Sequence, residues 1–236
     1  MIYNEDCIQT MMRIESETID CCVTDPPYKL TSGGCTTKGL IAGHFRNANN
    51  EVTDGAKNGK IFSHNDIDMK DWMPEIYRIL KPQTHFYCMC NDSYLQEVLN
   101  VGEQVGFIEQ NVLVWEKGMH TPTQYYFKNI EFIVMFRKGN AKYINDIGTF
   151  ALLKIRGMTG KAHPSQKPVG LFQKLIENST QPNEIVIDPF MGMGTTAIAC
   201  ERAKRKYIGS EIDETFYNMA MQNMKNVLSQ QQLFNE

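Results

Sequence analysis

The chain has 236 residues, of which 42% are hydrophobic and 22% charged, with a formal net charge of −3. It is long enough for one substantial α/β domain, and no apolar stretch approaches the 18 residues of a transmembrane helix. The seven cysteines show no paired C-x-x-C spacing of the kind that binds zinc, so we expect no metal and a reducing, cytoplasmic location.

Hydrophobic periodicity and turn residues predict strands that alternate with helices along most of the chain. This order predicts an α/β fold with a mostly parallel central sheet and helices on both faces. Residues 29–68 are rich in Gly and Asn and predict a long mobile loop. The expected strands are 1–6, 19–24, 85–90, 111–116, 130–136, 184–188 and 207–212, and the expected helices are 7–13, 71–80, 92–105, 169–178, 195–203 and 213–228.

The first informative pattern is Asp25, Pro26, Pro27 and Tyr28, which follows the apolar strand 19–24. Because proline fixes φ and has no N–H, the chain can neither continue as sheet nor enter a helix at once. The result is a rigid tip that carries a carboxylate, free carbonyl groups and an aromatic face. A planar amine with two N–H donors fits this set, although the bland alternative is a strand-ending turn.

The second pattern is a buried strand, a glycine turn and a helix beginning near residue 195. The glycines let a ligand approach the backbone, and the start of the helix offers free N–H groups to an anion. The next strand ends at Glu211, where an acid commonly accepts hydrogen bonds from ribose hydroxyls. This pattern predicts a site for an adenosine-bearing ligand. Its residues are Asp188, Phe190, Gly192, Gly194, Thr195 and Glu211.

Two alternatives for this turn remain open. Gly192, Gly194 and Ala197 match the dinucleotide fingerprint G-x-G-x-x-A, as in an NAD-dependent dehydrogenase. Against it, the strand ends in Asp-Pro-Phe before the glycines, and only two strand–helix units follow. The other alternative is a glycine-rich turn without a ligand.

Charge is distributed unevenly. Residues 117–174 contain ten Lys or Arg and two acids, a net charge of +8, which leaves −11 on the remainder. A segment this one-sided can contact a phosphate backbone, and a solvated face is the competing interpretation.

Together the motifs resemble the S-adenosylmethionine-dependent amino-methyltransferases of DNA. The tip at residues 25–28 resembles their catalytic motif, residues 188–196 their cofactor motif, and residues 163–168 a third motif. Residues 115–117 and 130–139 resemble weaker family elements. The catalytic motif precedes the cofactor motif, which is the order of the beta group. The resemblance spans nearly the whole chain except residues 29–65 and 140–160, and implies a Rossmann-like fold whose chain begins at the third strand of the usual sheet.

The resemblance implies a role for each matching residue. Asp25 and the Pro26 carbonyl would accept hydrogen bonds from the target amine, Pro27 would stiffen the tip, and Tyr28 would stack on the base. The cofactor, S-adenosyl-L-methionine, would be held by Asp6, Cys7, Asp188, Phe190, Gly192, Gly194, Thr195, Glu211, Ser165 and Lys167. Contacts to DNA are expected from Lys154, Arg156, Lys161 and His163.

Asp25 at the first catalytic position suggests methylation of adenine N6, whereas Ser there would suggest cytosine N4. A base inside a duplex cannot reach such a site, so the resemblance implies a flipped target. Cytosine N4, an RNA substrate, a glutamine side chain and a catalytically inactive nucleic-acid-binding protein remain alternatives. No cysteine is needed as a nucleophile.

We expect residues 1–236 to form one catalytic domain of the type found in restriction–modification systems, in a bacterial, archaeal or phage-infected cell. Residues 29–68 would close over the base, and residues 139–162 would form a short target-recognition insert. A small insert predicts a short or degenerate recognition sequence, and a homodimer would extend the contact surface. Residues Gln230 to Phe234 resemble peptides that dock on sliding clamps; a fraying helix end is the alternative.

Overall fold

The computed structural model describes residues 1–27, 67–121, 126–140, 142–156 and 167–233. Strands alternate with helices along most of these ranges, as expected for an α/β protein, except that β4, β5 and β6 follow one another with no helix described between them. The strands are β1 (Ile2–Tyr3), β2 (Ile19–Thr24), β3 (Leu80–Cys90), β4 (Ile108–Thr121), β5 (Lys128–Arg137), β6 (Leu152–Leu153), β7 (Ile185–Asp188) and β8 (Lys206–Ser210). The helices are α1 (Cys7–Met12), α3 (Met69–Ile79), α4 (Leu95–Val105), α5 (Val169–Ser179), α6 (Thr195–Arg202) and α7 (Glu214–Leu233).

All eight strands form one sheet in the order β1-β8-β7-β2-β3-β5-β4-β6. Every neighbouring pair is parallel except those of β5, which runs antiparallel to β3 and to β4. The carboxyl ends of β1, β8, β7, β2, β3 and β4 therefore meet at one edge of the sheet, where β5 begins. This edge is where ligands bind in open α/β sheets.

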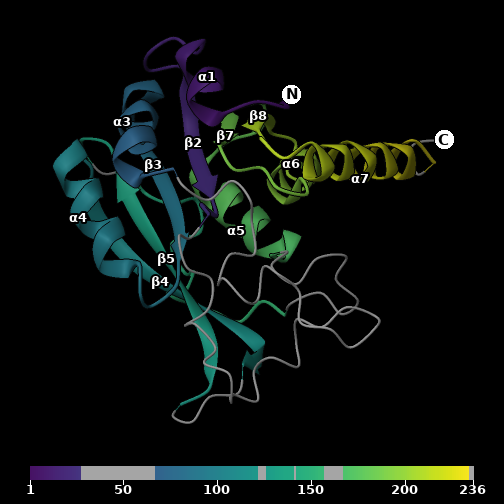
Figure 1. Cartoon of the computed structure of the whole chain (residues 1–236). Coiled ribbons are helices and arrows are strands. Elements are labelled where there is room, and N and C mark those ends of the chain that lie inside the picture. Colours follow the sequence, from purple (N-terminus) through teal and green to yellow (C-terminus); the bar gives the residue numbers. More distant parts are fainter. Residues whose placement is uncertain (28–66, 122–125, 141, 157–166, 234–236) are drawn as a thin grey trace, which may run out of the picture.

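Helices cover both faces, which confirms the expected layers (Figure 1). One core cluster packs the sheet against α5, α6 and α7, and the other packs it against α1, α3 and α4. Strand β3 shows how one strand serves both cores: Phe86 and Cys88 face the second cluster, whereas Tyr87 and Met89 face the first. This alternation follows from the two-residue period of a strand.

Strand β1 is an outermost strand of the sheet and not a central one. Strand β1 pairs with β8, which is the last strand along the sequence, through Ile2 opposite Gly209. Strand β2 pairs with β7 in the middle of the sheet. This topology confirms the permuted strand order expected from the order of the motifs.

Several boundaries differ from expectation. Pro82 was expected to separate a helix from the strand at 85–90, yet β3 begins directly after α3 and contains Pro82. An irregular stretch accommodates it: Gln83 has a φ of +63°, and the β2–β3 register shifts between Ile19 and Cys21.

Helix α4 begins three residues later than expected because the Asn91 side chain accepts hydrogen bonds from the preceding turn. Strands β4 and β5 are longer than expected, at 14 and 10 residues.

Within the described ranges no helix is both long and apolar enough to cross a membrane. The loop expected at residues 29–68 falls almost wholly outside the described residues. Helix α7 continues to Leu233, beyond its expected end at 228, so the tail segment that resembles a clamp-docking peptide begins inside a helix.

Helix α4 packs on β5 without space for an additional methyl group at Gly102. A Cβ there would lie 2.4 Å from Cζ of Phe136, a ring that is fully buried. We expect Gly102→Ala to lower the free energy of unfolding by about 1–3 kcal/mol in a urea titration, because the core must shift. Gly170→Ala is the matched control, since its nearest contact would be an ordinary 3.7 Å. Equal stability of Gly102→Ala and the parent would contradict this packing.

Candidate active site

The catalytic motif begins where β2 ends, at the ligand-binding edge of the sheet. Thr24 is fully buried, Asp25 is half-buried, and Pro26 is buried. The Thr24 hydroxyl donates a hydrogen bond of 2.6 Å to Oδ1 of Asp188, which ends the neighbouring strand β7. The catalytic tip is thus joined directly to the strand that leads into the glycine turn.

Asp188 is a buried hub and not an exposed ligand-binding group. It is 2% exposed, and its carboxylate accepts hydrogen bonds from the hydroxyls of Thr24 and Thr196 and from the N–H of Phe190. Burial raises the pKa of Asp188 to about 6, although these donors favour the charged form. The carboxylate holds the end of β2, the glycine turn and α6 together, and a role of Asp188 in binding the cofactor stays a prediction.

The glycine turn has the open backbone that its sequence predicted. Gly192 and Gly194 have φ of +54° and +85°, a region that side-chain-bearing residues rarely adopt. A Cβ at Gly192 would meet nothing within 4 Å, so a ligand can approach the backbone there. Gly194 is the N-cap of α6 without a side-chain hydrogen bond, which leaves the first N–H groups of the helix for a ligand.

Glu211 follows β8 and faces the same turn. Its Oε2 accepts a hydrogen bond of 2.8 Å from the N–H of Gly192, and its Oε1 accepts one of 2.9 Å from the N–H of Asp213. Burial raises the pKa of the Glu211 carboxyl. These contacts fix the carboxylate at the edge of the turn, in the place expected for an acceptor of ribose hydroxyls.

The other residues predicted to bind the cofactor have structural contacts of their own. Asp6 caps α1 by accepting a hydrogen bond of 2.8 Å from the N–H of Ile8, and the Cys7 side chain is 4% exposed in the core. Any contact from Cys7 would have to come from its backbone. Phe190 packs edge-on against Trp72, with ring centroids 5.1 Å apart.

Lys167 makes a contact that the sequence did not predict. Its ammonium lies 2.7 Å from Oδ2 of Asp25 and 3.2 Å from Oε2 of Glu131, and Lys117 lies 3.3 Å from Oε1 of Glu131. Lys167 thus forms ion pairs with two acidic side chains, and its expected contact with the cofactor carboxylate stays a prediction. Lys117 and Glu131 belong to the two weaker motifs of the sequence, which had no assigned role.

Four of the predicted site residues, Tyr28, Lys161, His163 and Ser165, lie outside the described residues. The two remaining candidates for DNA contact, Lys154 and Arg156, are exposed after β6. Lys154 is 3.9 Å from Glu116, a separation at which a solvent-exposed pair contributes little. Both cations therefore remain accessible to a phosphate.

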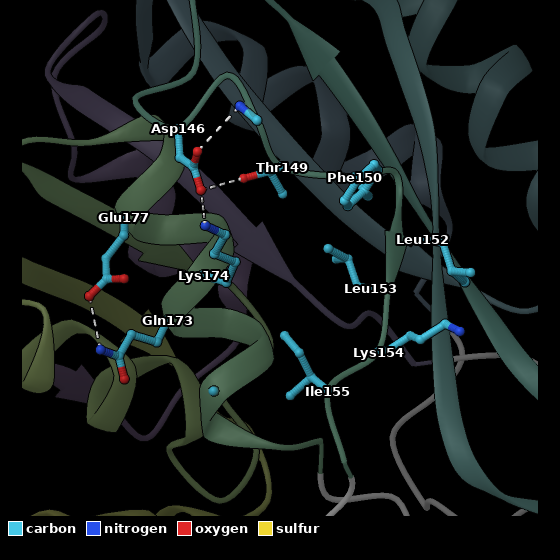
Figure 2. A pocket seen from close by; sticks show the side chains of 12 residues that line it. Asp146, Thr149, Phe150, Leu152, Leu153, Lys154, Ile155, Gln173, Lys174 and Glu177 are labelled. Atoms are coloured by element: carbon cyan, nitrogen blue, oxygen red, sulfur yellow. Dashed lines mark hydrogen bonds and ion pairs between the residues drawn. The ribbon is translucent and has the colours of Figure 1, made fainter.

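A groove of about 600 Å³ separates the segment 146–155 from α5. Figure 2 shows Asp146 pointing towards Thr149 and Lys174, with Leu153 and Ile155 opposite the helix. Its lining, within the described part of the chain, includes neither the catalytic tip nor the glycine turn. The groove therefore lies between the segment 146–155 and α5, and its described lining does not include the residues of the predicted catalytic motif.

Comparison with known proteins identifies the family. A model of the DNA methylase family, which covers N6 and N4 methyltransferases, matches residues 19–154 and 152–222. The chain belongs to this family. The DNA methylase match includes both the catalytic tip and the glycine turn, so the fold and the site point to the same chemistry.

Curated relatives of this DNA methylase include the type II methyltransferase M2.MboI of Moraxella bovis, which is 28% identical and aligns with 93% of this chain and 85% of its own length. M.HpaI of Haemophilus parainfluenzae is also 28% identical, over 93% of this chain and 72% of its own length. Both matches extend over nearly all of this chain.

Solved structures share the fold. The M1.HpyAVI–SAM complex superposes with a TM-score of 0.67 at 22% identity, over 94% of this chain and 98% of its own. The cytosine-N4-specific PvuII DNA methyltransferase gives a TM-score of 0.72 at 19% identity, over 93% and 84%.

The raised pKa of Asp188 predicts a pH dependence of stability. Because the folded protein favours the protonated carboxyl, its contribution is full below about pH 4 and is lost as the pH rises through about 6. The stability of the parent relative to Asp188→Asn should therefore fall by roughly 3 kcal/mol between these limits, as measured by urea unfolding.

Asp146→Asn provides the contrasting control. The hydrogen bond from Lys174 lowers the pKa of the exposed Asp146, so its contribution is present at neutral pH and is lost as the pH falls. The two variants should show opposite slopes relative to the parent. A flat difference for Asp188→Asn from pH 3.5 to pH 7 would contradict a raised pKa at this hub.

Proposed function

We propose that this DNA methylase transfers a methyl group from S-adenosyl-L-methionine to the exocyclic N6 of a flipped adenine. The observation that carries the proposal is the hydrogen-bonded connection from Thr24 through Asp188 to Thr196. It fixes the amine-binding tip beside the glycine turn. A methyl donor and its acceptor need this close arrangement, because orienting two reactants supplies much of the rate of a bimolecular step.

The cofactor site has the features that an adenosine-bearing sulfonium requires. Gly192 leaves the backbone open, Glu211 offers a fixed carboxylate for ribose hydroxyls, and the first N–H groups of α6 suit the methionine carboxylate. Thr195 stands at this helix start. When bound, the cofactor supplies an activated methyl group on a positively charged sulfur.

The chemistry follows from the weakness of the target amine. Its lone pair is delocalised into the base, so the nitrogen is a poor nucleophile. Asp25 and the Pro26 carbonyl accept hydrogen bonds from the two N–H groups of the target amine and draw its nitrogen towards tetrahedral geometry. As the new N–C bond forms and the S–C bond breaks, Asp25 stabilises the positive charge on the nitrogen, which then loses one proton through Asp25 to water.

The thiols near the site are unsuited to covalent catalysis. Burial and the neighbouring carboxylates of Asp25 and Glu131 raise the pKa of Cys90 to about 12, and burial raises that of Cys88 as well. A thiolate is therefore strongly disfavoured at neutral pH. This supports direct attack of the amine on the methyl group without an enzyme-bound intermediate.

Asp25 favours adenine over cytosine, since the resemblance places Ser at this position in the cytosine-N4 enzymes. Cytosine N4 remains the second candidate because the PvuII enzyme, which shares the fold, is named as cytosine-N4-specific. The two are distinguished by the modified base itself.

We further propose that residues 139–162 contact the DNA. Lys154 and Arg156 supply exposed charge in this segment, and strand β6 attaches it to β4. Phosphate contacts of this kind position a protein without specifying sequence. A short recognition sequence, closure of residues 29–68 over the base, a homodimer and docking of residues 230–234 on a clamp remain predictions.

Asp25→Ala should lower methyl transfer to unmethylated DNA by at least about 1000-fold, because it removes the acceptor of the target amine. Transfer is measured with labelled cofactor, and nuclease digestion of the product should give N6-methyldeoxyadenosine. Cofactor affinity, measured by calorimetry, should change less than about threefold, which serves as the control for folding. Transfer by Asp25→Ala at the parent rate would refute the mechanism. Recovery of N4-methyldeoxycytidine from DNA treated with the parent would identify cytosine, and not adenine, as the target base.

Replacing Lys154 and Arg156 together by Gln should weaken DNA binding without changing the preference for sequence. If each cation contacts one phosphate, the slope of log affinity against log salt should become less negative by about 2. Fluorescence anisotropy at several salt concentrations measures this slope. Gln replacement of Lys204 and Lys206, which are exposed beyond α6 near the opposite side of the sheet, is the matched control. An unchanged slope in the first pair would exclude both residues from the DNA interface.

A further inference from the structure

Four charged side chains of alternating sign form a row that ends at the catalytic carboxylate. Lys117 of β4 pairs with Glu131 of β5 at 3.3 Å, Glu131 pairs with Lys167 at 3.2 Å, and Lys167 pairs with Asp25 at 2.7 Å. The row has two positive and two negative members, so it is neutral as a whole.

Lys167 is the most enclosed member of the row. Its side chain is 10% exposed, against 22% for Asp25 and 19% for Glu131. Burial acts to lower the pKa of Lys167, but the charges of Asp25 and Glu131 outweigh it and raise the pKa above its usual value. The side chain is therefore a cation at neutral pH.

The row crosses the sheet where a direct contact between β2 and β5 is blocked. Strand β3 lies between them, and Cys90 at its end pairs with Phe132 of β5. Lys167, from the segment before α5, reaches over this strand end and contacts one carboxylate on each side. Since both Asp25 and Glu131 act on the Cys90 thiol, all three groups share one buried region.

The two contacts of Lys167 differ in kind. With Oδ2 of Asp25 it forms a hydrogen bond of 2.7 Å, whereas the 3.2 Å contact with Oε2 of Glu131 is an ion pair without hydrogen-bond geometry. Charge-assisted hydrogen bonds are directional and about twice as strong as neutral ones. Lys167 therefore fixes the orientation of Asp25, while Glu131 compensates the charge of Lys167.

We propose that Lys167 is a positioning residue for Asp25 and that Glu131 holds Lys167 in that position. The inference rests on the proposed function, in which Asp25 must be ionised and aimed at the target amine. The hydrogen bond from the ammonium to Oδ2 fixes the rotation of the Asp25 carboxylate and so sets the direction in which it meets the target amine. Lys167 contacts neither the base nor the methyl group in this assignment, and its role passes through Asp25 alone.

The test compares Lys167→Met with Lys167→Arg and with Lys81→Met. Lys167→Met should lower kcat about 100-fold, because a misplaced catalytic group costs about this much. The dissociation constant of S-adenosylhomocysteine, measured by calorimetry, should change less than about twofold. Lys167→Arg keeps the charge, so its kcat should be at least about tenfold higher than that of Lys167→Met. Lys81→Met is the matched control, since Lys81 pairs with Asp20 near the other end of β2 and should leave kcat unchanged.

Glu131→Gln should give an intermediate loss, about tenfold in kcat, because Lys167 keeps its contact with Asp25 but loses its second anchor. A loss of affinity for S-adenosylhomocysteine in Lys167→Met, with kcat at saturating cofactor near that of the parent, would overturn the proposal and assign Lys167 to the cofactor carboxylate. Unchanged kcat and affinity would overturn it as well.

Two further measurements keep the proposal testable if Lys167→Met is unstable, and the second of them does not depend on turnover. The Lys167→Met, Glu131→Gln double variant removes one positive and one negative charge, so it should fold and still show low kcat. A stability cycle of Asp25→Asn and Lys167→Met should show coupling of roughly tenfold in the unfolding equilibrium constant. Additive effects would refute the contact. If the parent methylates cytosine, the proposal of adenine as the target is wrong. The coupling between Asp25 and Lys167 and the comparison of kcat values would still decide the role of Lys167.

Discussion

The hydrogen bonds of the buried Asp188 carboxylate are the constraint on which the rest of the site depends. Its three donors come from the end of β2, from the glycine turn and from α6. A buried carboxylate is costly unless its oxygens are paired, so these three segments can hardly move apart without leaving it unsatisfied. The amine-binding tip and the cofactor turn, 164 positions apart between Thr24 and Asp188, are therefore set at a fixed separation.

A second set of charges completes the catalytic edge on its other side. Whereas Asp188 is held by neutral hydroxyl and amide donors, Asp25 is held by the ammonium of Lys167. The two carboxylates lie close enough that Asp25 adds to the raised pKa of Asp188. The two environments differ. Asp188, whose pKa is raised by burial, supports the fold, whereas Asp25 lies next to the ammonium of Lys167.

The sequence predicted the parts of the protein that local pattern controls. Strand β2 has the expected bounds because its six residues are all buried, and four of the six are apolar, with Asp20 and Thr24 as the polar exceptions. The helix after the glycine turn was also expected at Thr195. The start of α4 was placed three residues too early because residues 92–94 form a turn, held by the Asn91 side chain, before the helix begins at Leu95.

Contacts between distant residues could not be predicted in the same way. The direction of the Asp188 side chain depends on hydroxyls at Thr24 and Thr196, and neither carries a periodic signal. Lys167 was assigned to the cofactor because its motif suggested it, yet its partner is 142 residues away. Glu131 was noticed in the sequence without a role, since an acid within an apolar strand acquires meaning only from the cation that reaches it.

The pairing of β1 with β8 has a consequence for how the protein is made. Ile2 leaves the ribosome long before its neighbour in the sheet, Gly209, has been synthesised. The sheet around β2, β3 and β5 can assemble earlier, since these strands precede residue 138. During translation the nascent chain can therefore form the part of the sheet around β2, β3 and β5 before β1 pairs with β8, and contacts of such long sequence separation form slowly.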